Sequence, residues 1–529
     1  MLFRSNKKTI LVLAIVALVG LPMEAMGAVS SPTSPGAIEF TLGGYVKMET
    51  DWDSTQNNLN CVAPIARSND PSGQHGRLKF SANNSRFNFT VKGPKVFGAT
   101  LTGFLEFDCG ANSGNYNQTD TTSVFRMRHA MFRLNWPETE LMLGQYWGFF
   151  SEFGTEVAQD GGLQNIGWFN QRMPQVRVTQ KFLGAYTVSA MIAAPTNMYD
   201  SANQAAFQTW NAQVANAATG GVTNLPGETS ETPQVQLKAA YEADLWGKAA
   251  YLGVPKGFTA QVNAGWQRTR YRSALMTAGT YYTFGQDQFQ LLGQPTNFRD
   301  PYIRNTQYLD PWVVQANLFI PVLANTTANL AGTASILASW YIGAGVDAFG
   351  GGNPSNGSYL VFDKQGMITA AAPMVAAGPL GRGDAANLYK RRLKESFGGY
   401  VQAQYYFTNQ WYLNFVYGMN RAFNVTRGMN AACVTPTNPQ GYTIAMPADL
   451  YNLWQQYNLT LWYRPIQALK FGVEYAYTRT HWFQRTTAGQ IWNGNPANPA
   501  FANPAVPCGS EISSMGESHR VMFAGFFYF

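Results

Sequence analysis

Charged side chains occupy alternate positions in many segments of this chain. In the first such segment, Lys47, Glu49 and Asp51 alternate with the apolar Val46 and Met48. Because successive side chains of a β-strand point to opposite faces, the three charges share one face and the apolar residues share the other. Charges of both signs on the wall of a narrow polar pore orient water and select solutes by charge. In this segment alone, the spacing fits either the solvated surface of a soluble sandwich or the lining of a polar pore.

The motifs of catalytic chemistry are not found in the sequence. It contains no HExxH zinc motif, no G-x-S-x-G nucleophile elbow and no phosphate-binding glycine loop. Its four histidines are scattered without the spacing of metal ligands. We therefore expect no enzyme, no metal site and no cofactor.

The alternation recurs along the whole chain and predicts an all-β protein. A soluble sandwich would turn the apolar faces inward, whereas a barrel in lipid turns them outward. We expect sixteen strands, with eighteen as the alternative. The expected strands are 40–52, 77–92, 99–108, 123–135, 140–147, 174–182, 186–194, 233–243, 258–270, 311–320, 333–345, 395–407, 411–421, 453–464, 468–480 and 518–529.

The connections between these strands alternate in length. Tight links at 93–98, 136–139, 183–185, 408–410 and 465–467 interleave with long ones at 196–232, 272–310, 346–394, 422–452 and 482–517. Outer-membrane barrels have short periplasmic turns and long extracellular loops. The sequence therefore predicts a closed antiparallel transmembrane barrel with both termini at the periplasmic end.

The two ends of the chain indicate the compartment. Arg4, Lys7 and Lys8 precede an apolar run that is too short for the roughly 20 residues of a membrane-spanning helix. Small residues follow, so residues 1–27 are expected to be a signal peptide, 28–39 a short segment, and 40–529 a single barrel. The last expected strand is rich in aromatic residues, ends on Phe529, and is expected to pair with the first strand.

The composition fits an outer surface that does not face water. Charged residues make up 13% of the chain, about half the usual quarter. The mean hydropathy of −0.19 excludes a helical membrane protein. The formal charge is +7, of which the expected signal peptide contributes +2. The basic residues form no tract that could follow a phosphate backbone. Nucleic acid is therefore not an expected partner.

Several short motifs resemble those of the trimeric porins, and most of all the DcaP-like porins. They are Ser85-Arg86-Phe87-Asn88-Phe89, Phe125-Arg126-Met127-Arg128-His129-Ala130, Leu143-Gly144-Gln145-Tyr146-Trp147, Pro174-Gln175-Val176-Arg177-Val178-Thr179-Gln180 and Val473-Glu474-Tyr475. The resemblance implies an outer-membrane homotrimer and a final Phe529 that the assembly machinery reads. DcaP-like relatives begin with a periplasmic coiled coil, and here only a short Ser/Pro-rich segment precedes the first strand. We therefore expect neither that coiled coil nor the plug of a TonB-dependent receptor.

If the apolar faces meet lipid, the opposite faces line the lumen. The expected lumen residues are Lys47, Glu49, Asp51, Arg86, Lys92, Glu106, Asp108, Arg126, Arg128, Arg177, Lys181, Lys238, Glu242, Lys470, Glu474 and Arg520. Placing Arg126 and Arg128 inward also turns Phe132 and Leu134 inward unless a bulge intervenes. Basic residues outnumber acidic ones in this set, so we expect a mild anion preference.

The segment 148–173 is the candidate constriction loop, because the third loop of porins folds into the barrel. It contains Phe149, Phe150, Glu152, Glu156 and Asp160. Acidic loop residues that face Arg86, Arg126, Arg128 and Arg177 would set a transverse field across the pore. That arrangement is the expectation for this loop.

All four cysteines fall in expected long loops. An exported protein meets an oxidising compartment, so disulfides are expected. Loop adjacency favours Cys61 with Cys109 and Cys433 with Cys508 among the three possible pairings.

The sequence as a whole indicates a porin in the outer membrane of a Gram-negative bacterium, with passive diffusion of small hydrophilic solutes. A channel selective for small carboxylates and a barrel-anchored structural or adhesive protein are the alternatives. Outer-membrane lipid is an expected partner, and the basic cluster at 390–394 is expected to contact lipopolysaccharide.

Overall fold

The structure is a computed structural model in which the strands and most of the short connections are described. The described residues are 29–30, 38–55, 68, 75–111, 124–159, 166–196, 231–271, 282–284, 287–289, 307–327, 329–351, 361–362, 391–393, 395–422, 451–482 and 515–529. Within this part of the chain, none of the helices combines the length and the apolar character needed to cross a membrane.

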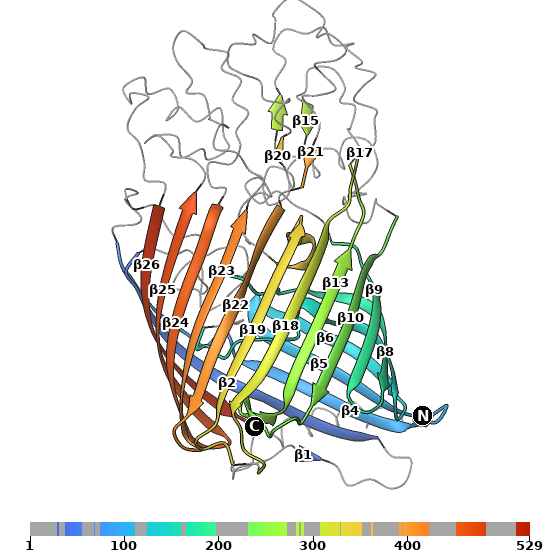
Figure 1. Cartoon of the computed structure of the whole chain (residues 1–529), viewed down its shortest axis with the longest axis vertical. Helices are drawn as coiled ribbons and strands as arrows, with labels where there is room; N and C mark the ends of the chain where they lie inside the picture. Colours follow the sequence, from blue (N-terminus) through green and yellow to red (C-terminus); the bar gives the residue numbers. More distant parts are fainter. Residues whose placement is uncertain are drawn as a thin grey trace, which may run out of the picture.

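The described strands form one closed antiparallel barrel (Figure 1). It has sixteen strands, which confirms the predicted fold and strand number and not the eighteen-stranded alternative. The barrel strands are β2 (Glu39–Asp53), β3 (Arg77–Ser81) with β4 (Arg86–Val96), β5 (Ala99–Ala111), β6 (Val124–Asn135), β7 (Thr139–Trp147), β8 (Arg172–Phe182), β9 (Tyr186–Ala193), β10 (Gln234–Ala243), β13 (Phe258–Trp266), β18 (Trp312–Leu323), β19 (Ala334–Ala344), β22 (Glu395–Tyr406), β23 (Trp411–Ala422), β24 (Tyr451–Ile466), β25 (Leu469–Trp482) and β26 (Met515–Tyr528).

Short elements accompany the barrel strands. The sheet contains 18 labelled segments, because β1 is a two-residue addition to β2 and because β3 and β4 are two parts of one strand that pairs with β2. The other short elements are β1 (Val29–Ser30), η2 (Phe149–Ser151), β11 (Ala249–Tyr251), β12 (Val254–Lys256), β14 (Thr269–Tyr271), β15 (Tyr282–Phe284), β16 (Asp287–Phe289), β17 (Gln307–Leu309), η5 (Val346–Phe349), β20 (Val361–Phe362) and β21 (Arg391–Arg392).

The first and last barrel strands close the barrel, as the sequence predicts. Along β2 and β26, Tyr45 pairs with Tyr528 and Asp53 pairs with Arg520. Phe529 exchanges two backbone hydrogen bonds of 3.2 Å with Gly44. Figure 1 places the C-terminus at the end of the barrel that carries the short turns. Closure leaves no sheet edge with unpaired backbone groups, which is what a strand-built wall in lipid requires.

Side chains of the wall alternate between an exposed outer face and a buried inner face. On β2, Val46 and Met48 are 46% and 44% exposed, whereas Lys47 and Glu49 are buried. On β26, Phe523 is exposed and Arg520 is buried. The outer surface is therefore largely apolar, and the charges of these strands point to the inside.

Two irregularities shift this alternation. The turn between β3 and β4 moves the inward charges from odd positions, such as Arg77, to even positions, such as Arg86. In β6, His129 pairs with Glu106 and Met127 pairs with Phe107, so Arg128 is the extra residue of a β-bulge. Because of this bulge Arg128 points inward while Phe132, 44% exposed, stays on the outer face.

The turns at one end of the barrel are short, with two exceptions. The β10–β13 connection, residues 244–257, contains the hairpin of β11 and β12. The β18–β19 connection, residues 324–333, lies beside it, and Lys248 and Asn325 join the two through a pair of 2.8 Å backbone hydrogen bonds. The sequence rhythm of short turns and long loops did not reveal this hairpin.

Candidate functional site: a loop anchored across the lumen

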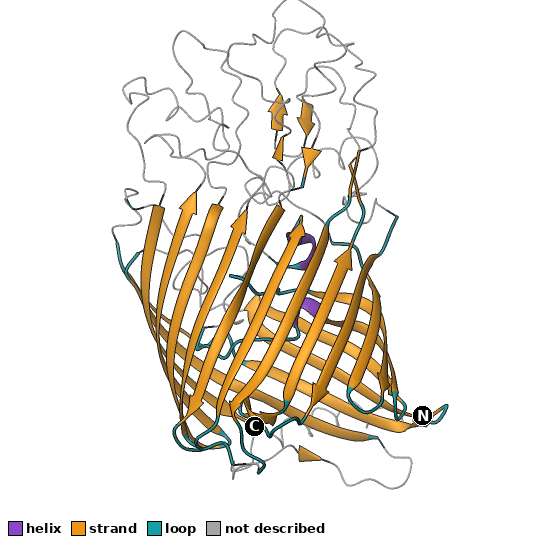
Figure 2. Ribbon diagram, in the orientation of Figure 1, coloured by secondary structure: helices purple, strands orange, loops and turns teal. Residues whose placement is uncertain are grey.

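The described residues of the connection between β7 and β8, 148–159 and 166–171, fold inside the barrel. This inner loop, residues 148–171, begins with the helix η2, whose residues Phe149, Phe150 and Ser151 are buried. Figure 2 shows the two short helices η2 and η5 within the outline of the strands. The loop ends two residues earlier than the sequence predicts, because β8 begins at Arg172. Asp160 lies outside the described residues.

The first anchor of the inner loop is Glu152. Its two carboxylate oxygens accept hydrogen bonds from Arg177 Nη1 at 2.9 Å and from Lys238 Nζ at 2.8 Å. The same two cations lie over the ring of Phe149, at 4.4 and 4.9 Å from its centroid. Arg177 is on β8 and Lys238 is on β10, so this anchor holds the start of the loop to the wall next to its own strand.

The second anchor, Glu156, crosses to the other side of the barrel. Its carboxylate is ion-paired with Lys470 of β25 and accepts hydrogen bonds of 2.7 Å from Tyr412 and Gln404. The peptide group of Glu156 is held as well: its N–H donates to Gln402 and its carbonyl accepts from Asn414, each at 2.7 Å. Strands β22, β23 and β25 therefore share one loop residue.

The third anchor is the backbone of Ala158. Its N–H donates to Glu474 at 2.7 Å, and its carbonyl accepts from Lys47 Nζ at 2.9 Å. Thr460 and Asn458 also donate to Glu474, which keeps the carboxylate fixed. Two residues predicted from the sequence as lumen charges thus hold the loop to β2 and β25, the two strands that flank β26.

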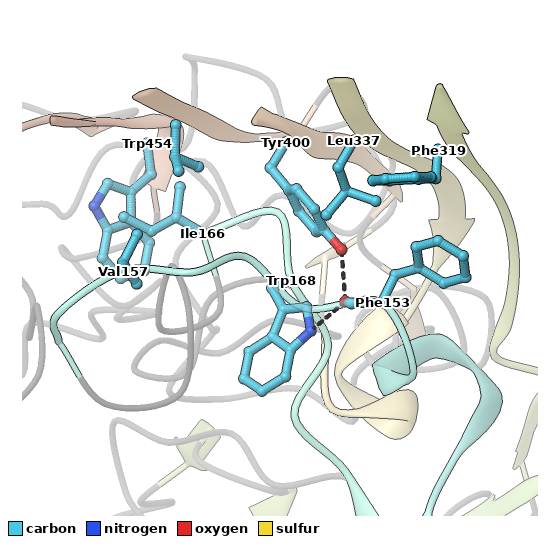
Figure 3. Close-up of a cluster of buried hydrophobic side chains, with 9 residues drawn as sticks. Phe153, Val157, Ile166, Trp168, Phe319, Leu337, Tyr400 and Trp454 are labelled. Atoms are coloured by element: carbon cyan, nitrogen blue, oxygen red, sulfur yellow. Dashed lines mark hydrogen bonds between the residues drawn. The ribbon is translucent and has the colours of Figure 1, made fainter. Parts of the chain in front are cut away.

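An apolar cluster fills the space between the inner loop and the wall (Figure 3). Phe153, Trp168 and Ile166 of the loop pack on inward side chains of the wall, among them Leu337 and Tyr400. The carbonyl of Phe153 accepts hydrogen bonds from Tyr400 Oη at 2.6 Å and from Trp168 Nε1 at 2.9 Å. The wall members of the cluster are Phe319, Leu337, Tyr400, Val416 and Trp454.

One glycine permits the close approach of loop and wall. Gly167 has a φ of +80°, and a Cβ placed on it would lie 2.0 Å from the carbonyl oxygen of Gly399 on β22. The N–H of Gly167 donates to Asn420 at 2.9 Å. A side chain at this position would therefore push the returning arm of the loop off the wall.

A wall of amide side chains receives the loop, and sequence reasoning missed it. Gln236 accepts a 2.9 Å hydrogen bond from the N–H of Phe149, Asn263 donates to the carbonyl of Phe149 at 3.0 Å, and Gln315 donates to that of Phe150 at 3.2 Å. The buried amides of this wall include Gln234, Gln236, Gln261, Asn263, Gln267, Gln315, Asn317, Gln402, Gln404, Asn414, Gln456 and Asn458. Several of them occupy alternate positions of a strand, as Gln234 and Gln236 do, and this spacing is the sequence signal for them.

The remaining wall carries most of the charges. Arg126 forms a bidentate pair with Asp108, at 2.9 and 2.7 Å, and Arg128 bonds to Glu106 at 2.7 Å and to Asp108 at 2.5 Å. Arg86 lies 3.8 Å from Glu106. Of the four arginines expected to face the loop carboxylates, Arg177 bonds to Glu152, whereas Arg86, Arg126 and Arg128 lie beside other carboxylates. The acidic partners of the others are on β5, because the loop carboxylates are already held at their anchors.

Arg172 belongs to the same wall and was not among the predicted residues. Its guanidinium lies over Trp147, 4.7 Å from the ring centroid. Within the described part of the chain it forms no ion pair with a carboxylate, and its Nη1 is buried without a hydrogen-bond partner. Among the described residues, Arg86, Arg126 and Arg128 thus share Glu106 and Asp108, and Arg172 lies beside them because it stacks on Trp147 together with Arg128.

A second charged group lies where β2, β3 and β26 meet. Lys47 pairs with Glu49 at 2.6 Å, and Asp53 accepts from Arg520 at 2.7 Å and from Arg77 at 3.4 Å. Asp51, between the two acidic neighbours, is fully buried. Arg77 was not predicted, because the turn after β3 changes which positions face inward, and Asp53 lies one residue beyond the predicted strand 40–52.

The other predicted positions are dispersed. Lys181, at the end of β8, is exposed and contributes nothing to the loop anchors. Cys109 lies within β5, not in a loop as expected, and its thiol is free. Cys61, Cys433 and Cys508 lie outside the described residues. The free thiol of Cys109 does not confirm the predicted Cys61–Cys109 pair, and the Cys433–Cys508 pair stays a prediction. Phe529 packs its ring on Phe87, with centroids 5.8 Å apart.

Comparison with known proteins identifies the fold. No protein-family model and no curated protein sequence matches the chain. The outer membrane channel DcaP of Acinetobacter baumannii has a TM-score of 0.56 at 14% sequence identity, over 95% of this chain and 100% of that chain. An anion-selective porin from Comamonas acidovorans has a TM-score of 0.43 at 10% identity, over 95% and 100% of the two chains. OmpF of Salmonella typhi has a TM-score of 0.42 at 11% identity, over 95% and 100%.

The similarity to DcaP carries the structural argument, since the other two scores are too low to add to it. The chain has the fold of the outer-membrane porins, a sixteen-stranded barrel, and the predicted structural resemblance is confirmed. At 14% identity the similarity establishes the fold and leaves selectivity open.

Proposed function

We propose that the protein is a porin of the Gram-negative outer membrane, which passes small hydrophilic solutes by passive diffusion. The observation that carries this proposal is the combination of a closed barrel, an apolar outer face and a charged inner wall beside an anchored loop. Passive diffusion requires no covalent step and no cofactor.

The outer face supports insertion into lipid. Large apolar side chains, such as Leu78, Phe80, Phe125 and Val178, are about half exposed or more around the barrel. Soluble monomers rarely expose contiguous apolar patches of more than a few hundred Å². An apolar band that surrounds a closed barrel is instead typical of transmembrane barrels.

The inner loop is the proposed constriction. Its anchors Glu152, Glu156 and Ala158 lead from the β8–β10 side of the barrel to the β25–β26 side, so the loop divides the lumen. The amide wall and the apolar cluster fill the β18–β24 side. Solutes would therefore pass beside the charged strands β2 to β8.

The charge of that passage supports a mild anion preference. Among the described residues, Arg86, Arg126 and Arg128 pair with two carboxylates, Glu106 and Asp108, and Arg172 adds a further positive charge beside them without an ion pair of its own. A fixed excess of one sign in a low-dielectric channel raises the local concentration of the opposite ion. The same arginines favour the second candidate, a channel selective for small carboxylates, because guanidinium groups bind carboxylates in a bidentate manner.

Processing and assembly complete the proposal. Residues 1–27 are a signal peptide, 28–39 a short segment and 40–529 the barrel. The barrel is proposed to assemble as a homotrimer, on the basis of the motif resemblance. Lipopolysaccharide is the proposed lipid partner. Chemical cross-linking of the purified protein tests the trimer, because a single monomer band would contradict it.

Liposome swelling tests the function directly. Purified protein is reconstituted and challenged with sugars, amino acids and dicarboxylates of increasing size. A general porin gives rates that fall smoothly with solute size and are somewhat higher for anions of equal size. A carboxylate-selective channel instead favours dicarboxylates over sugars of the same size, and an anchor protein gives no swelling with any solute.

A further inference from the structure

A hairpin at the short-turn end of the barrel folds inward and meets the inner loop. It consists of β11 and β12 on the connection between β10 and β13. Ala249 and Ala250 are buried, and Ser335 of β19 donates a 3.0 Å hydrogen bond to the carbonyl of Ala250. A solvent-facing turn would leave these residues exposed, so the hairpin is part of the interior.

The hairpin touches the inner loop through Tyr251. The N–H of Gly154 donates to Tyr251 Oη at 3.2 Å. The ring of Tyr251 lies 5.9 Å from that of Phe153 and 5.7 Å from that of Phe319, measured between centroids. Tyr251 therefore joins the loop to strand β18 of the barrel wall.

The hairpin also reaches across the end of the barrel. Ala250 packs in the same apolar cluster as Ala158 of the loop and Trp462 of β24. A Cβ placed on Gly253 would lie 3.1 Å from Arg464 Nη1 of β24. The hairpin starts between β10 and β13 and thus extends to β24, beneath the middle of the inner loop.

Its base is fixed by the neighbouring turn. Lys248 and Asn325 exchange two backbone hydrogen bonds. Asn409 holds this β18–β19 connection, because its side-chain oxygen accepts hydrogen bonds from the N–H groups of Leu330 and Ala331 at 2.9 and 3.2 Å. Lys256 pairs with Glu242 at 2.8 Å at the other leg of the hairpin.

We infer that the β11–β12 hairpin is a second part of the constriction, and that Tyr251 is a positioning residue that supports the inner loop from the periplasmic side. The pore size then depends on two connections from opposite ends of the barrel. This inference rests on the proposed porin function. Without Tyr251, the segment around Gly154 loses its support, and we expect the loop to fluctuate and the passage to widen.

The test compares three full-length variants in planar bilayers and in liposomes. Tyr251→Ala removes ring and hydroxyl, Tyr251→Phe removes the hydroxyl alone, and Val254→Ala, at an exposed position of the same hairpin, is the matched control. We expect Tyr251→Ala to raise the single-channel conductance and the size limit for sugars. Tyr251→Phe should have the conductance and the size limit of the unchanged protein and differ from it only by more frequent brief closures. Val254→Ala should match the unchanged protein in all three properties.

Unaltered conductance, closure frequency and size limit in Tyr251→Ala would overturn the inference, provided that the variant migrates as a folded barrel. If Tyr251→Ala does not assemble, Tyr251→Phe decides: closures at the frequency of the unchanged protein would contradict the inference. A failure of the proposed function is distinct, because the unchanged protein itself would then pass no current.

Discussion

Glu156 and Lys470 form a buried ion pair that joins the inner loop to β25, although 314 residues separate them in the chain. Tyr412 and Gln404 complete the surroundings of the carboxylate. A loop held in the lumen by apolar packing alone could shift without breaking a specific contact. This pair instead ties the position of the loop to the far wall of the barrel.

Neutralising Glu156 should loosen the inner loop. In Glu156→Gln, Lys470 is left buried without its counter-charge, and breaking a buried pair costs about 3–5 kcal/mol. We expect frequent transitions between conductance levels in single-channel recordings, with the barrel still assembled. Asp310→Asn, in an exposed pair with Arg268, is the control and should record like the unchanged protein. Steady single-level openings in Glu156→Gln would show that this pair does not hold the loop.

Gly167→Ala should displace the returning arm of the loop. The left-handed conformation costs a non-glycine residue roughly 1–2 kcal/mol, and the added methyl group would also overlap the carbonyl oxygen of Gly399. We expect an altered conductance and faster proteolysis of the loop. Gly154→Ala lies on the same loop, where an added Cβ meets nothing within 4 Å, and should change neither. Equal behaviour of the two variants would contradict the close approach.

Arg172 should contribute to anion preference. Arg172 pairs with no carboxylate among the described residues. Arg172→Gln therefore removes a positive charge without breaking an ion pair there. We expect the reversal potential in a salt gradient to move toward the cation side. Arg421→Gln, on the exposed outer face of β23, is the charge-matched control. An unchanged reversal potential in Arg172→Gln would remove this residue from the passage.

The loop anchors should survive mild acid. Glu152 and Glu156 lie on the inner loop, outside the spanning strands. Burial alone would raise the pKa of each carboxyl, but Lys238 and Arg177 at Glu152, and Lys470 at Glu156, more than offset it and lower the pKa below the ordinary 4.5. Such groups stabilise the fold above their ordinary pKa, and that contribution is lost as the pH falls through the folded value.

Single-channel noise should therefore stay constant from about pH 7 to about pH 5 and increase only in stronger acid. The measurement is the closure frequency across this range. An increase already near pH 6 would mean that the two carboxylates are not held as ion pairs.

Phe529 should matter for assembly more than for conduction. Its backbone pairs with Gly44 and its ring packs on Phe87, so it completes the seam between β2 and β26. Deleting Phe529 should lower the yield of heat-modifiable barrel in the membrane, while the molecules that do assemble conduct normally. Phe529→Tyr keeps the ring and should assemble well. A normal yield after the deletion would argue against a role as assembly signal.

Period-two alternation was sufficient to predict the strands. Each of the sixteen expected segments overlaps a barrel strand, and the pairing of the first strand with the last follows from closure. The alternation depends only on backbone geometry and on the apolar surroundings of the wall, both of which act locally on the sequence.

The interior was less predictable, because it depends on contacts between distant residues. Phe319 and Trp454 point inward, although the pattern assigns apolar residues to lipid, since the inner loop covers them. Arg77 was missed because a turn changed the alternation after β3. The inward course of the β11–β12 hairpin depends on the contact of Tyr251 with a loop almost 100 residues earlier, and no local signal marks it.

The central claim is that a water-filled passage remains beside the anchored inner loop. Planar-bilayer recording of the purified, heat-modifiable protein in symmetric salt tests it most directly. The account predicts discrete, steady openings whose current is proportional to voltage at low voltage. Folded protein that inserts into the bilayer and carries no steady current would contradict it.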